Sequence, residues 1–138
     1  MKLFKTLLTI LFISLLSSPS WSVTLGDLVH REGIYYEKFT DVPFTGKVTG
    51  KEQGSFKNGV KDGTWVSYHK NGQLESKGNF KNGEAEGAWV RYWGNGQLFY
   101  KGNFKNGKYN GTWVAFNEDG SVFKSWTGTY KDGVYISD

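Results

Sequence analysis

The sequence predicts an all-β fold, a single-layer open antiparallel β-meander of repeated β-hairpins with about seven to nine strands. Three observations predict this fold: a repeat of fixed period, strand-forming segments in every copy, and regularly placed turn dipeptides. Residues 54–77 (GSFKNGVKDGTWVSYHKNGQLESK) are followed at 78–101 by GNFKNGEAEGAWVRYWGNGQLFYK, an offset of 24 residues. A period in this range is typical of one supersecondary unit stacked on copies of itself.

The repeat array is predicted to span residues 54–138. The third copy, 102–127, is two residues longer than the others, and a partial fourth copy occupies 128–138. Each full copy contains an aromatic and β-branched segment that suits a strand, at 65–68, 89–92 and 113–116. The pairs Asn71-Gly72, Asn95-Gly96 and Asp119-Gly120 follow these segments, and we expect them to form two-residue hairpin turns.

Residues 23–53 do not follow the repeat, and we interpret them as an atypical N-terminal capping segment. Residues 25–31 predict a short helical turn or an irregular stretch, 34–39 a strand, 41–46 a turn and 46–56 one further strand. A repeat array needs an atypical end because its first unit has no neighbour to cover its edge. The alternative is that this segment docks a specific partner.

The repeated pattern resembles the MORN repeat in its bacterial variant form. It reads G-x-[FY]-K-[ND]-G-x-x-x-G-x-W-V-x-[YF]-x-x-[ND]-G-x-[LV]. The resemblance covers residues 54 to 133 and implies an antiparallel meander used for binding. Some bacterial relatives are labelled antitoxins, and eukaryotic relatives are associated with membranes and scaffolds.

The first 22 residues have the features of a secretory signal peptide. Lys2 and Lys5 precede an apolar stretch at 6–16, and small residues at positions 20 and 22 predict cleavage before Val23. The alternative is an uncleaved membrane anchor. The chain contains no cysteine, which excludes a disulfide framework and lipoprotein attachment. We therefore expect a secreted or periplasmic protein, and export argues against neutralisation of a cytoplasmic toxin.

Charge and chemistry exclude several classes of function. The chain has 17 basic and 13 acidic residues, and two of the basic ones lie in the signal peptide, so we do not expect a nucleic-acid partner. With two histidines and no cysteine the usual structural zinc site is excluded. No nucleophile–base pair or phosphate-binding glycine motif is present in the sequence. We predict a protein that is not an enzyme, with no catalytic residues, metal or cofactor.

Strand alternation places the tryptophans of the repeat on one face. Trp65, Trp89 and Trp113 point away from the face that carries the valines at 66, 90 and 114. Two interpretations remain for this tryptophan ladder. Either the rings are structural and lie over glycines of neighbouring strands, or they form an exposed aromatic platform for a ligand.

Five residues that vary between copies are the candidate binding residues. A residue outside the repeat consensus is less needed for the fold, so it is free to serve recognition. Trp93 stands where the other copies have His69 or Asn117, Phe99 and Tyr100 stand where the first copy has Glu75 and Ser76, and Arg91 replaces a small residue. The predicted binding set is Trp93, Phe99, Tyr100, Arg91 and His69.

A row of lysines recurs directly before an Asn-Gly or Asp-Gly turn in each copy, at Lys57, Lys81, Lys105 and Lys131. We interpret it as a solvated rim that discourages aggregation of sheet edges. The alternative is recognition of an anionic surface such as phospholipid headgroups.

From these features we expect a non-enzymatic binding module or scaffold with a protein partner in the cell envelope or extracellular space. The competing hypothesis is a polysaccharide- or lipid-headgroup-binding module that uses exposed aromatics and the lysine rim. Oligomerisation through the ends or edges of the sheet is also consistent with an open array.

Overall fold

The computed structural model describes residues 22–138, so the predicted signal peptide lies outside the described residues apart from Ser22. Within them the chain is all-β. The elements are η1 (Leu25–Asp27), β1 (Leu28–Arg31), β2 (Ile34–Glu37), β3 (Gly46–Val48), β4 (Glu52–Lys57), β5 (Val60–Tyr68), β6 (Leu74–Lys81), β7 (Glu84–Tyr92), β8 (Leu98–Lys105), β9 (Lys108–Tyr109), β10 (Gly111–Ala115), η2 (Lys124–Trp126), β11 (Gly128–Lys131) and β12 (Val134–Ser137).

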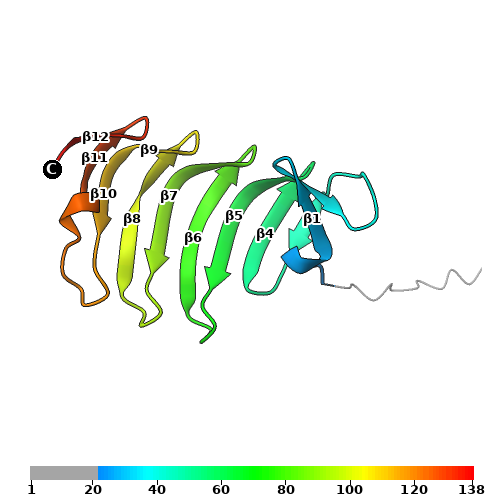
Figure 1. Ribbon diagram of the computed structural model, residues 1–138, viewed down its shortest axis with the longest axis horizontal. Helices are drawn as coiled ribbons and strands as arrows, with labels where there is room; N and C mark the ends of the chain where they lie inside the picture. The colour runs from blue at the N-terminus through cyan, green and yellow to red at the C-terminus, as the bar shows by residue number, and fades with distance from the viewer. Residues whose placement is uncertain (1–21) are drawn as a thin grey trace, which may run out of the picture.

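The predicted open meander is confirmed. Ten strands form one antiparallel sheet in the order β12-β11-β10-β8-β7-β6-β5-β4-β3, with β9 beside β8, and β1 and β2 form a separate hairpin. Figure 1 shows the strands side by side in one layer, with the β1–β2 hairpin at one end and β12 at the other. There are more strands than expected, because the third copy is divided into β9 and β10 and the N-terminal segment contributes three.

The turns differ from the prediction. The tight two-residue turns are Asn58-Gly59, Asn82-Gly83 and Asn106-Gly107, which connect β4 to β5, β6 to β7 and β8 to β9. Both residues of each turn have positive φ, near 50° for each asparagine. That conformation matches the twist of antiparallel strands. Asp132-Gly133 forms the same turn between β11 and β12.

The predicted hairpin turns at Asn71-Gly72, Asn95-Gly96 and Asp119-Gly120 are instead longer loops in which the glycine alone has positive φ. In the first loop the Asn71 side-chain oxygen accepts the Gln73 N–H at 3.1 Å. The Asn71 side chain also donates to the Gly94 carbonyl of the next copy at 2.8 Å. Asparagine is therefore used here for its side chain rather than for its left-handed backbone.

Each consensus tryptophan packs on a glycine of the preceding strand. The rings of Trp65, Trp89 and Trp113 cover Gly54, Gly78 and Gly102, where an added Cβ would overlap the ring. Each indole N–H also donates to the carbonyl of the residue after that glycine, at 3.1, 3.2 and 3.0 Å. The structural interpretation of the tryptophan ladder is confirmed, since Trp65 and Trp113 are each only 4% exposed.

Phenylalanines connect these tryptophans into one aromatic row. Phe56, Trp65, Phe80, Trp89 and Phe104 follow one another across the sheet, with ring centroids 5.0–6.1 Å apart and ring planes near 80–90° to each other. Edge-to-face contacts of this kind stabilise aromatic pairs beyond the area that they bury. The aromatic row is thus a hydrophobic core that runs across one face of a single-layer sheet.

The N-terminal segment packs on the first strands of the array. Residues 46–56 form two strands rather than the one predicted, because the chain reverses near Gly50, whose φ is +102°. A small core forms there from Leu28, Phe44, Val48, Phe56 and Trp65. The Gly59 N–H donates to the Phe44 carbonyl, and its carbonyl accepts the Tyr35 N–H, both at 2.8 Å. The first tight turn is therefore fixed to this segment.

The tryptophan–glycine packing makes a specific prediction about stability. Gly78→Ala should lower the free energy of unfolding by about 1–3 kcal/mol, because the new methyl group must displace the Trp89 ring. Gly94→Ala is the matched control, because nothing lies within 4 Å of its added Cβ and its φ is ordinary. Urea unfolding measures the loss of stability in both variants. Equal losses would show that the packing of the Trp89 ring does not require glycine at position 78.

Candidate functional site

The sheet presents two faces of different chemistry. No α-helix occurs among residues 22–138, and the N-terminal segment packs over the β3–β5 end of the face that carries the aromatic row. None of the described helical turns has the length and apolar character needed to cross a membrane. We call the face with the aromatic row the aromatic face, and the opposite one the lysine–valine face.

The lysine–valine face has a regular lateral row. Strand register pairs Val66 with Lys77, Lys77 with Val90, Val90 with Lys101, and Lys101 with Val114. Valine and lysine therefore alternate across five strands, β5, β6, β7, β8 and β10. The valines are half-buried and the two lysines are exposed. The aliphatic stems of lysine add apolar surface between the valines while the ammonium groups stay in water.

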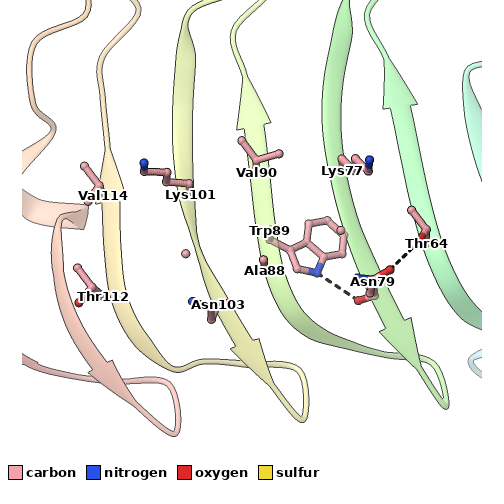
Figure 2. Close-up of a pocket in the computed structure, with 12 residues that line it drawn as sticks. Thr64, Lys77, Asn79, Ala88, Trp89, Val90, Lys101, Asn103, Thr112 and Val114 are labelled. Atoms are coloured by element: carbon pink, nitrogen blue, oxygen red, sulfur yellow. Dashed lines mark hydrogen bonds between the residues drawn. The ribbon is translucent and has the colours of Figure 1, made fainter.

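A groove of about 610 Å³ runs across this face. Figure 2 shows Val114, Lys101, Val90 and Lys77 at one level and a second row of small polar or methyl side chains beside them. The second row consists of Thr112, Asn103, Ala88, Asn79 and Thr64. Thr64 donates to the Asn79 side-chain oxygen at 2.8 Å, which fixes one end of the row. The floor of the groove is thus apolar with polar groups along one side.

The charges of this face are mostly positive. Register and alternation from β3 to β12 place eight lysines and three acidic residues on it: Lys47, Lys57, Lys77, Lys81, Lys101, Lys105, Lys108 and Lys131, against Asp62, Glu84 and Glu86. Glu86 is partly engaged, because it accepts the Asn106 N–H at 2.9 Å. The predicted lysine rim therefore lies along one edge of a larger positive face.

The aromatic face contains the other predicted binding residues, and two of them form hydrogen bonds to the next copy. His69 donates from Nε2 to the Tyr92 carbonyl at 2.9 Å. Trp93, the equivalent residue one copy later, donates from its indole N–H to the Phe116 carbonyl at 3.0 Å. Both side chains therefore connect one copy to the next.

Phe99, Tyr100 and Arg91 lie together on the same face. Trp93 packs on Phe99 with ring centroids 4.0 Å apart, and Phe99 contacts Tyr100 at 5.0 Å. Arg91 forms an ion pair with Glu75 at 2.6 Å and lies 5.9 Å above the Phe99 ring. The structure thus brings four of the five predicted residues into one cluster and leaves His69 at the preceding copy.

A second, smaller cavity of about 250 Å³ lies beside this cluster, and Tyr100 is one of its walls. Tyr109, Trp113, Trp126 and Tyr130 form the other aromatic walls. Burial raises the pKa of the Tyr109 phenol above its ordinary value of 10.0, and Tyr100 and Tyr130 add to the effect. Tyr109 is therefore a neutral phenol at physiological pH.

Sequence reasoning did not select Lys77, Lys101, Tyr109 or Trp126. The two lysines carried a usable signal, because they recur 24 residues apart directly before the consensus glycines. Trp126 carried another, because it falls in the two extra residues of the third copy. Among residues 22–138 no group of His, Asp and Glu side chains is arranged to hold a metal ion.

The family comparison agrees with the repeat architecture. The model of the MORN repeat variant matches two adjacent segments, residues 61–82 and 85–106. These segments cover β5 to β8, which carry the middle of both faces. No curated protein and no solved structure matches the chain.

The contacts of Trp93 predict a measurable cost of removing it. Trp93→Ala should lower the free energy of unfolding by about 1–3 kcal/mol, since it loses both a half-buried ring and an inter-repeat hydrogen bond. Trp93→Phe keeps the ring and should lose only about 1 kcal/mol. Urea melts measure both. A cost near zero for Trp93→Ala would instead mark the residue as free for recognition.

Proposed function

We propose that this chain, which carries MORN repeats at 61–82 and 85–106, is a non-catalytic binding module that docks an acidic protein segment on its lysine–valine face. MORN repeats are generally associated with binding and scaffold roles. The observation that carries the proposal is the valine–lysine row across five strands of an uncovered sheet face.

The row supports a partner that is apolar at its centre and acidic around it. Val90 and Val114 offer an apolar floor to the groove, and Val66 continues the same row one copy earlier. The flanking lysines favour carboxylates and disfavour basic partners, so charge sets the specificity and the approach. Burial of the valines and lysine stems then supplies the affinity.

A protein segment fits this face better than a flat membrane surface. The groove is recessed, and side chains such as leucine can reach its floor while acidic neighbours meet Lys77 and Lys101. A bilayer surface would contact protruding ammonium groups and leave the valines in water. Val134 of β12 is 67% exposed, pairs with Lys131 and extends the apolar surface toward that edge.

We further propose that the module acts in the cell envelope or the extracellular space. The predicted signal peptide supports export, and residues that follow the predicted cleavage position are already part of the fold. The Val23 carbonyl already accepts the Thr49 N–H at 2.8 Å, and Val23 packs against the N-terminal core.

The docking proposal is tested by charge reversal. Lys77→Glu combined with Lys101→Glu should reduce the amount of cross-linked protein partner recovered from the native envelope about tenfold or more. The new carboxylates would repel the acidic groups of the partner at the centre of the face. Lys70→Glu with Lys124→Glu is the matched control, since it makes the same charge change at exposed positions outside the strands. Binding should also weaken as salt rises from about 50 to 200 mM.

Two outcomes would contradict the proposal. The reversed variant could recover the partner as well as the control does, which would place the interface elsewhere. Alternatively, vesicles of an anionic phospholipid could bind with the same dependence on Lys77 and Lys101 while no protein is recovered, which would make the face a lipid surface.

Export makes a separate prediction. N-terminal sequencing of the protein from an envelope or culture fraction should begin at Val23. Ser22→Arg places a large charged residue at the cleavage position and should leave the precursor uncut. A mature protein that still begins at Met1 would support the membrane-anchor alternative.

A further inference from the structure

We propose that the aromatic cavity bounded by Tyr100, Tyr109, Trp113, Trp126 and Tyr130 is a binding site for a quaternary ammonium group. The site lies on the aromatic face and is independent of the protein-docking face proposed above. Its volume of about 250 Å³ suits a small headgroup rather than a polymer.

Departures from the repeat build this cavity. Trp113 and Tyr130 occupy aromatic positions of every copy, but Tyr100 stands where the preceding copy has Ser76. Tyr109 stands where the earlier copies have Lys61 and Ala85. Trp126 belongs to the two additional residues of the third copy. Three residues that the repeat does not require therefore converge on one site.

The additional residues are held firmly over the sheet. Thr127 accepts the Ala115 N–H at 3.0 Å and donates to the Ala115 carbonyl at 3.3 Å. This contact fixes η2, and Trp126 then stacks on Phe99 with a centroid distance of 6.0 Å and an interplanar angle of 12°. The Trp126 side of the cavity is thus built on the strands rather than suspended in a loop.

The rings surround the cavity at different inclinations. Tyr109 meets Trp113 at 56° and Tyr130 at 65°, and Tyr100 meets Trp126 at 54°. A sugar stacks best on one flat exposed ring, whereas a near-spherical cation can contact several inclined rings at once. The inclined rings therefore favour a compact cation.

The chemistry of the lining favours a cation that needs no carboxylate partner. Besides the aromatic rings, the described residues that line the cavity are Ala115, Ser125 and Gly133, so none carries a carboxylate or an amide side chain. A primary ammonium, whose strong hydrogen bonds are to carboxylates, finds only tyrosine and serine hydroxyls there. A trimethylammonium group donates no hydrogen bonds, so its transfer to aromatic faces loses none. Choline-type headgroups are the ligand class that fits.

The test compares a cation with its neutral isostere. Choline chloride should perturb tryptophan fluorescence of the purified protein in a saturable way, with an affinity about tenfold or more above that of 3,3-dimethyl-1-butanol at matched ionic strength. Trp126→Ala and Tyr109→Leu should each lower choline affinity about tenfold. Val122→Ala is the control, since Val122 is exposed in the same loop and does not line the cavity.

Further arms separate the sources and the alternatives. Vesicles of phosphatidylcholine and of phosphatidylglycerol distinguish a lipid headgroup from free choline: selective, Trp126-dependent binding to the former would extend the site to lipids. Circular dichroism and urea melts confirm that each variant is folded. The Lys77→Glu, Lys101→Glu variant should bind choline normally, so failure of the docking proposal leaves this one intact.

Three results would overturn the inference. They are equal affinity for choline and its neutral isostere, no saturable choline binding by the folded wild-type protein, and Trp126-dependent binding of an oligosaccharide without any of choline.

Discussion

The packing of each tryptophan on the glycine of the neighbouring strand is the constraint on which the rest of this structure depends. A single-layer sheet has no second layer to bury its hydrophobic groups, so burial must occur within the layer. Removing the Cβ at Gly54, Gly78 and Gly102 lets a large ring lie flat on the backbone of the adjacent strand. The indole N–H then bonds to the next carbonyl, so the ring satisfies its polar atom as it is buried.

This arrangement explains why the two faces differ. Because the aromatic row supplies the lateral core, the opposite face does not need large side chains and carries valine, threonine, asparagine and lysine instead. Side chains on that face are therefore less constrained by packing. Valine and lysine alternate there along one register, which places apolar surface and positive charge at fixed intervals and is the basis of the docking proposal.

Repetition also changes what a variable residue means. Trp93 varies between copies, yet its indole makes the same inter-repeat hydrogen bond that the His69 ring makes one copy earlier. Two different side chains fill one structural role because both present a ring N–H at the same place. Tyr100, Tyr109 and Trp126 vary as well, and their departures converge on a cavity. Variation therefore indicates function more strongly when several departures meet in space.

The sequence by itself determined the architecture. The signals for it are local: the 24-residue period, the Asn-Gly pairs and the segments that begin with Trp65, Trp89 and Trp113. Because side chains alternate along a strand, these signals also predict which residues share a face, without knowledge of distant contacts. Tertiary structure decided which glycine lies under which ring, which Asn-Gly pair forms the tight turn, and that Trp126 reaches Tyr100 and Phe99. These depend on register, bulges and the path of a two-residue insertion, which are set by pairing between strands and not by the residues of any one strand.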